Sequence, residues 1–191
     1  MPRLALYTFG VLKDVTGSEI LSDFVAIAPS VYAEAETVDG FIAHAGAARP
    51  DLSGKSKLGE DFGPWGIAAA PRFYKGSTKP GEDTMITTLS LWRDIEAARR
   101  FTYGGLHRTA LRRRSEWFKK PEWPGYVLWW VADEKVPTWT DGARKLEALG
   151  SDGPISTGFD FTTCFDSAGR KIELAQRNER IQVRLKQTRS R

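Results

Sequence analysis

The chain has 191 residues, of which 41% are hydrophobic and 27% charged, so it is not disordered throughout and can build the core of one domain. Its single cysteine, Cys164, excludes an internal disulfide framework. No stretch approaches the ~20 apolar residues that a membrane span needs. We therefore expect a cytoplasmic protein with no membrane partner.

The net charge of +4 is unevenly distributed along the chain. Residues 167–191 hold eight cationic side chains and two acidic ones, a net charge of +6, which leaves −2 on the rest of the chain. Because the body is not basic, specific nucleic-acid binding is not expected. We expect one domain over residues 1–166 and a solvated or partner-bound basic tail over residues 167–191.

The first half of the chain predicts two strands and a helix. Residues 4–12 are rich in strand formers, and apolar residues recur at helical spacing from Ser22 to about Ala35, with Pro29 inside the pattern. Residues 41–48 predict a second strand. Residues 49–83 contain four prolines and little periodicity, which predicts a long loop of the kind that often forms a lid.

The second half completes a β-α-β-β-α-β order. Residues 85–92 predict a third strand, Asp94 caps a long helix to about Phe118, and residues 126–131 form a fourth strand that is apolar on both faces. A helix over 138–149 and a short strand over 158–165 follow. The order predicts an α+β, ferredoxin-like protomer. Because its helices can cover only one sheet face, we expect a homodimer in which the partner's sheet covers the other face.

The long helix contains the residues of greatest chemical interest. Gly104 and Gly105 weaken a helix interior and predict a bend. On a helical wheel drawn from Ile95, the apolar arc beyond this pair contains two polar residues, His107 and Arg114. Such a histidine is either a packed, hydrogen-bonded residue or a base, proton donor or haem ligand. Burial near a cationic side chain predicts a pKa below the usual ~6.5.

Several segments resemble one known family. LALYTFGVLK, DGF, LSLW, FTYGGLHRTALRRRSEWF, YVLWWV and GPISTGFDF together resemble the DUF3291 family over about residues 3–165. The resemblance implies a ferredoxin-like protomer that pairs into a dimeric α/β barrel. Relatives in that superfamily include cofactor-independent quinol or anthrone monooxygenases, haem-degrading enzymes and stress-response domains.

Three functional hypotheses follow. The first is an enzyme of the antibiotic-biosynthesis-monooxygenase type that oxidises a hydrophobic, aromatic or polyketide-like small molecule without a cofactor. In it His107 handles the proton, Tyr103 and Arg114 stabilise an oxyanion, and the substrate is held by Trp92, Trp117, Trp130, Phe118 and His44. The second is a haem protein with His107 as axial ligand. The third is a non-catalytic ligand-binding or structural homodimer. A dedicated metal site is not expected, because the chain has only two histidines.

Overall fold

The computed structural model describes residues 1–47, 49–52, 54–79 and 81–174. Its four-stranded sheet has the order β2-β3-β1-β4, and every neighbouring pair is antiparallel. The strands are β1 (Arg3–Val11), β2 (Phe41–His44), β3 (Met85–Trp92) and β4 (Tyr126–Val131). The helices are α1 (Ser22–Thr37), α2 (Ile95–Thr102), α3 (Gly105–Trp117) and α4 (Trp139–Asp152). Short 3-10 turns occupy Glu19–Leu21, Pro50–Leu52 and Gly63–Trp65.

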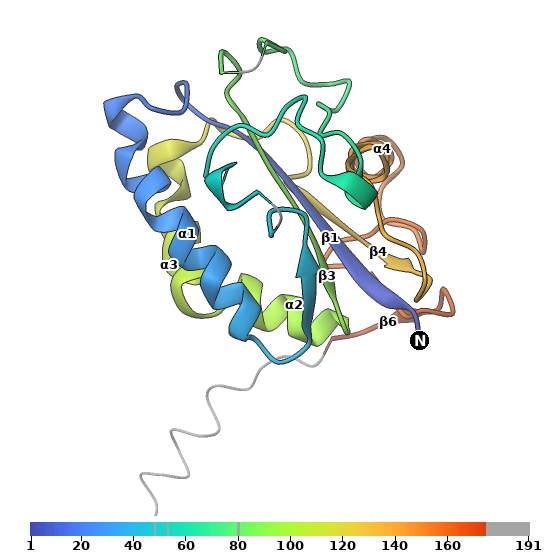
Figure 1. The fold of residues 1–191 in the computed structure, drawn as a ribbon. Helices are drawn as coiled ribbons and strands as arrows, with labels where there is room; N and C mark the ends of the chain where they lie inside the picture. The colour runs from blue at the N-terminus through green and yellow to red at the C-terminus, as the bar shows by residue number, and fades with distance from the viewer. Residues whose placement is uncertain (48, 53, 80, 175–191) are drawn as a thin grey trace, which may run out of the picture.

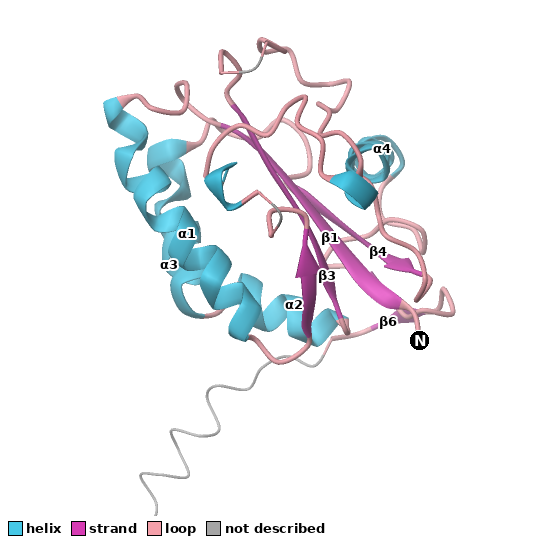
Figure 2. Ribbon diagram, viewed as in Figure 1, coloured by secondary structure: helices cyan, strands magenta, loops and turns pink. Residues whose placement is uncertain are grey.

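The mixed α+β class and the β-α-β-β-α-β order are confirmed (Figures 1 and 2). The bounds of β3 and β4 are those predicted, and α1 continues through Pro29. The predicted long helix after β3 is two helices, α2 and α3, which meet at Gly104. Strand β2 is shorter than predicted, because it ends at His44.

Each face of the sheet carries a separate core. On one face, the side chains Tyr7, Leu89 and Trp129 pack with Trp139 and Leu146 of α4. On the other face, a second set packs against α1, α2 and residues 159–174; it includes Leu4, Leu6, Trp92, Leu128, Ala35, Ile95 and Phe159. Figure 1 shows α1, α2 and α3 on one side of the sheet and α4 on the other.

The long segment between β2 and β3 covers the sheet together with α4. Leu58, Phe62, Ala68 and Tyr74 from this segment are buried in the core of the α4 face. The reason given for a homodimer was therefore wrong, because the chain itself covers both faces of its sheet. In the part of the chain that the structure describes, the four strands form an open sheet with β2 and β4 at its edges, and dimerisation remains a prediction.

The buried Lys57 joins this segment to α1 and β3 by hydrogen bonds. Lys57 is only 2% exposed. Its Nζ donates to the hydroxyl of Tyr32, at 2.8 Å, and to the carbonyl oxygen of Thr87, at 3.2 Å. Nearby, the buried carboxylate of Asp83 accepts a hydrogen bond from Ser56 Oγ at 2.6 Å. Residues 49–83 are thus packed against the domain by polar as well as apolar contacts.

The last described residues form a small hairpin. β5 (Cys164–Phe165) pairs with β6 (Lys171–Ile172), and the side chains of Ile172 and Leu174 pack against the core. The boundary predicted after residue 166 therefore falls inside this hairpin. Burial raises the pKa of the Cys164 thiol to about 11, as suits a packing residue. Most of the predicted tail, 175–191, lies outside the described residues.

Within the part of the chain that the structure describes, no helix is both long and apolar enough to cross a membrane.

Candidate functional site at the corner between two helices

A sharp corner between α2 and α3 presents His107. Asp94 caps α2 by accepting a hydrogen bond from the Ala97 N–H at 2.7 Å. The chain leaves that helix at Tyr103, passes through an extended Gly104, and begins α3 at Gly105, where φ is +41°. Glycine adopts this left-handed conformation at low cost, which explains why the break falls at the glycine pair.

The exposed N–H groups at the start of α3 are satisfied by a carboxylate from another helix. Glu34 of α1 accepts from the Leu106 N–H, with Oε2 at 2.9 Å and Oε1 at 3.0 Å, and from the His107 N–H at 3.3 Å. A carboxylate is favourable here because the N-terminus of a helix carries partial positive charge. Glu34 thereby fixes the position of the turn that carries His107.

The imidazole of His107 is held in one orientation. Its Nδ1 lies 2.8 Å from the carbonyl oxygen of Thr102, and its ring centroid lies 4.7 Å from that of Phe101. Since a carbonyl can only accept, Nδ1 carries the proton and a neutral ring has its lone pair on Nε2. Nε2 has no hydrogen-bond partner among the described residues.

Burial determines the charge state of this imidazole. Desolvation lowers the pKa of His107 and outweighs the Thr102 carbonyl and the Glu34 carboxylate, both of which act to raise it. The predicted lowering of the His107 pKa is confirmed, and its main cause is burial of the ring and not the charge of Arg114. At neutral pH the ring is therefore in its neutral form.

A row of aromatic rings joins the two histidines of the chain. From the ring of His107 the row continues through Phe101 (4.7 Å), Trp92 (5.2 Å) and Phe41 (5.3 Å) to His44 (5.8 Å, all between ring centroids). Apart from His44, these residues come from the segments DGF, LSLW and FTYGGLH, which are separate in the sequence. The fold brings them together at one end of the sheet.

The environment of His44 differs from that of His107. His44 is 9% exposed, and its Nε2 lies 3.0 Å from Glu36 Oε1. Its ring packs against Tyr32, and its Nδ1 is buried without a hydrogen-bond partner in the described part of the chain. α1 thus supplies a glutamate at each histidine, Glu36 here and Glu34 at the corner.

Tyr103 lies at the surface beside the corner. It is 45% exposed, and its ring packs edge-on against Phe161 at 5.6 Å. The hydroxyl of Tyr126 accepts from the Phe161 N–H at 3.2 Å. Burial, followed by interactions that include Tyr103 and Asp160, raises the pKa of Tyr126 well above its usual value, so this phenol stays protonated.

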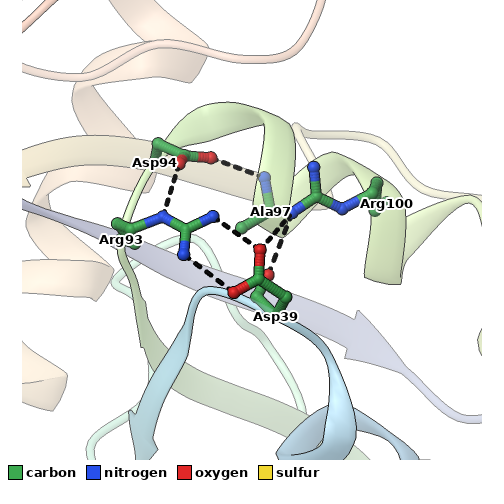
Figure 3. A network of polar contacts seen from close by, with 5 residues as sticks. All are labelled: Asp39, Arg93, Asp94, Ala97 and Arg100. Atoms are coloured by element: carbon green, nitrogen blue, oxygen red, sulfur yellow. Dashed lines mark hydrogen bonds and ion pairs between the residues drawn. The ribbon is translucent and has the colours of Figure 1, made fainter.

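An ion-pair network ties the turn before β2 to the start of α2 (Figure 3). Both terminal nitrogens of Arg93 donate to the carboxylate of Asp39 at 2.8 Å, and its Nε donates to Asp94 at 3.0 Å. Arg100 donates to the Asp39 carbonyl at 2.9 Å. Bonding to Arg93 lowers the pKa of Asp39. The network holds the DGF segment, residues 39–41, beside α2 and thereby keeps Phe41 in the aromatic row.

Arg114 lies about two turns along α3 from His107 but is exposed, and its neighbour Arg113 is the half-buried member of the triplet. Arg113 pairs with Asp23 and Glu116 and lies over the ring of Trp117 at 4.7 Å. The contacts of Arg113 are therefore structural, and the role predicted for Arg114 stays a prediction.

The predicted aromatic wall is not one surface. Trp117 packs with Leu12 and Leu21, and Phe118 contacts Phe24, at the far end of α3 from His107. Trp130 is half-buried and donates from Nε1 to the Phe165 carbonyl at 2.7 Å. Of the predicted substrate-binding residues, only Trp92 and His44 belong to the row that begins at His107.

The sequence-based prediction missed the partners supplied by α1 and by the long segment. Glu34, Tyr32 and Lys57 act through contacts with residues 25 to 73 positions away, and no local pattern marks them. Among the described residues, no group of three or more His, Cys, Asp or Glu side chains could hold a metal ion.

Comparison with known proteins identifies the chain's relatives without giving an activity. The family model described as "Domain of unknown function (DUF3291)" matches residues 3–175. No curated protein matches the chain. A crystal structure of the NE2512 protein of unknown function from Nitrosomonas europaea is similar at 17% identity and a TM-score of 0.40, over 72% of this chain and 96% of that one.

Proposed function

This chain belongs to the DUF3291 family, and we propose that it is a small enzyme in which His107 is the general base toward an aromatic or polyketide-like substrate. The proposal rests on the protonation state and the hydrogen bonding of the His107 imidazole. His107 is neutral through burial, its Nδ1 is fixed on the Thr102 carbonyl, and its Nε2 is unpartnered within the described residues. A base held by a second group, with its lone pair free, is the arrangement that proton abstraction requires.

The chemistry open to this group is the removal of a proton from an acidic hydroxyl or carbon acid. As Nε2 takes the proton, the ring becomes cationic. The Thr102 carbonyl and the Glu34 carboxylate both favour the charged ring, as their effect on its pKa indicates. Proton abstraction of this kind is the step that would begin oxidation of a quinol or anthrone in an antibiotic-biosynthesis-monooxygenase type of enzyme.

The surface beside His107 is suited to an apolar substrate. Tyr103 is 45% exposed and Leu106 is 40% exposed, and both flank the turn that carries the histidine. Tyr103 would stabilise a substrate oxyanion on this side through its hydroxyl. Arg114 is given no role, because its side chain is exposed to solvent.

The test is oxygen uptake with two probes, anthrone and 1,4-naphthohydroquinone. The wild type should consume oxygen, and His107→Asn should lower the rate at least about 100-fold, the usual contribution of a general base. Asparagine retains a donor for the Thr102 carbonyl, so the corner should stay folded. Arg114→Gln, on the same helix, is the matched control and should leave the rate unchanged. No uptake above buffer with either probe, or equal rates for wild type and His107→Asn, would overturn the proposal.

A haem protein is the second candidate, and the same hydrogen bond favours it. Histidines that bind metals usually donate their other ring N–H to a carbonyl or carboxylate, as His107 does to Thr102. Haem would supply redox chemistry, with Nε2 of His107 as its axial ligand. Titration of the protein with haemin should then give a Soret band that His107→Asn loses. An identical spectrum for the two proteins would reject this candidate.

The remaining alternative is a homodimer that binds a ligand or has a structural role, without catalysis, in the dimeric α/β barrel arrangement that the family resemblance implies. The physical reason first given for dimerisation no longer applies, since α4 and the side chains of Leu58, Phe62, Ala68 and Tyr74 cover the second sheet face. Light scattering decides the oligomeric state, because the protomer has a mass of 21.3 kDa.

A further inference from the structure

Two neighbouring hollows lie along α4, on the opposite side of the sheet from α1, α2 and α3 (Figure 1). One has a volume of about 330 Å³ and the other about 500 Å³, and Arg144 and Ala148 line both. The smaller hollow is also lined by Lys145, Leu149 and Ile155. None of the residues in the aromatic row or at the α2–α3 corner lines either hollow.

The smaller hollow contains an ammonium group with unused hydrogen-bonding capacity. Lys145 is half-buried, its Nζ lies 5.7 Å from the ring centroid of Trp129, and it donates to the Thr157 carbonyl at 2.6 Å. An ammonium has three N–H donors. Within the described residues this is its only hydrogen bond, and no carboxylate lies within ion-pair distance. Desolvation lowers the pKa of Lys145 and outweighs the more distant Asp141 carboxylate, which acts to raise it.

The carboxylates near Lys145 already accept hydrogen bonds from other groups. Asp141 accepts from the backbone N–H and hydroxyl of Thr138 at the start of α4, at 3.0 and 2.8 Å, and from Arg144 at 3.0 Å. Glu147, which lines the larger hollow, accepts from the backbone and side chain of Arg72, each at 2.7 Å. In the smaller hollow Asp141 is therefore paired with Arg144, and the positive charge of Lys145 has no carboxylate partner among the described residues.

The rest of its lining is apolar. Leu149 is buried, while Ile155 is 47% exposed and Ala148 is also exposed. An isoleucine is usually covered, so half-exposure at the wall of a hollow leaves apolar surface for a ligand. A cation at one end and an apolar wall beside it match an anion that carries a short hydrocarbon chain.

We propose that the hollow beside α4 is a second binding site, for a small amphiphilic carboxylate. The carboxylate would bind Lys145 Nζ, and the hydrocarbon chain would lie against Ala148 and Ile155. A carboxylate is preferred to a phosphate because its single charge matches the single ammonium of Lys145, whereas the positive charge of Arg144 is already paired with Asp141. The site is independent of the function proposed for His107.

The experiment maps amide chemical shifts while sodium hexanoate is added to the ¹⁵N-labelled protein. Saturable shifts should centre on Ala148, Leu149, Ile155 and Gly158. Acetate, which lacks the chain, and hexylamine, which reverses the charge, should bind at least about tenfold more weakly, because each loses one of the two contacts. Dispersed shifts with no saturation, or equal binding of hexylamine, would overturn the proposal.

Variants distinguish a specific contribution of Lys145 to hexanoate binding from a general effect of positive surface charge. Lys145→Met keeps the side-chain stem over Trp129 and should weaken hexanoate binding about tenfold. Lys171→Met, in β6, removes an equal charge elsewhere and should bind as the wild type does. If Lys145→Met does not fold, Lys145→Gln serves in its place. His107→Asn should bind hexanoate normally, so that loss of one site is distinguishable from loss of the other. Unchanged affinity in the position-145 variant would overturn the proposal.

Discussion

The backbone of Gly105 lies directly against the carboxylate of Glu34, so that a β-carbon at position 105 would overlap Glu34 Oε1. The close approach allows Glu34 to reach the N–H groups of Leu106 and His107. The glycine thus has two functions: it adopts a positive φ, and it leaves room for the group that caps α3.

Gly105→Ala should therefore destabilise the protein for two reasons. A left-handed backbone costs alanine about 1–2 kcal/mol. Displacing Glu34 should add about 1–2 kcal/mol, the value of a helix cap. The control is Gly63→Ala, because Gly63 also has a positive φ, +60°, but a β-carbon there would meet nothing within 4 Å. Urea unfolding measures both variants. Equal losses would show that contact with Glu34 contributes nothing.

Replacement of Glu34 itself tests the cap from the other side. Glu34→Ala leaves two backbone donors at the start of α3, the N–H groups of Leu106 and His107, without their carboxylate and should lower the free energy of unfolding by about 1–2 kcal/mol. Glu122→Ala, at an exposed loop position, should change it by less than about 0.5 kcal/mol. A Glu34→Ala protein as stable as the Glu122→Ala protein would contradict this role.

The lowered pKa of His107 predicts a pH dependence of stability. In the unfolded chain the imidazole titrates near ~6.5, whereas the folded protein holds it neutral to lower pH, so the unfolded state binds more protons between the two values. The contribution to stability is complete above about pH 6.5 and is lost as the pH falls below it. Unfolding measured from pH 5 to 8 should show this slope in the wild type. His107→Asn should have a flatter curve over the same interval, and identical curves would contradict the assignment.

The C-terminal hairpin predicts different outcomes for two truncations. Ending the chain after Leu174 removes only residues outside the described part and should leave cooperative unfolding intact. Ending it after Asp166 removes β6 and the partly buried side chains of Ile172 and Leu174, and should cost about 1–3 kcal/mol. Thermal denaturation compares the two chains. Equal transition temperatures would place the domain boundary at residue 166, as the sequence predicted.

Local pattern was sufficient for much of the fold. An alternation or a continuous apolar run defines a strand without reference to the rest of the chain, and the bounds of β3 and β4 were predicted correctly from it. The pair Thr138 and Asp141 likewise forms the capping box that starts α4. The glycine pair predicted a bend in one long helix, and the structure has a complete break between α2 and α3 at that position, where Gly105 has a positive φ.

The helical wheel treated residues 94–118 as one helix, but α3 begins a new helix at Gly105. His107 and Arg114 both lie in α3, about two turns apart, so the wheel placed them on one face irrespective of the break. The wheel could not show how deeply each residue is buried: His107 packs against Phe101, whereas Arg114 is exposed and Arg113 is half-buried. Angular position on a helix follows from the sequence, but the neighbouring elements decide which part of a face is covered.

The sequence by itself determined the strands, the helices, their order and the importance of the turn before His107. Only the tertiary structure decided that Glu34 caps this turn, that Lys57 fastens a long segment over the sheet, and that α4 covers the face left for a partner. The physical reason is the range of the interactions. Backbone preference and apolar periodicity act between residues a few positions apart, whereas these contacts join groups that only the folded chain brings together.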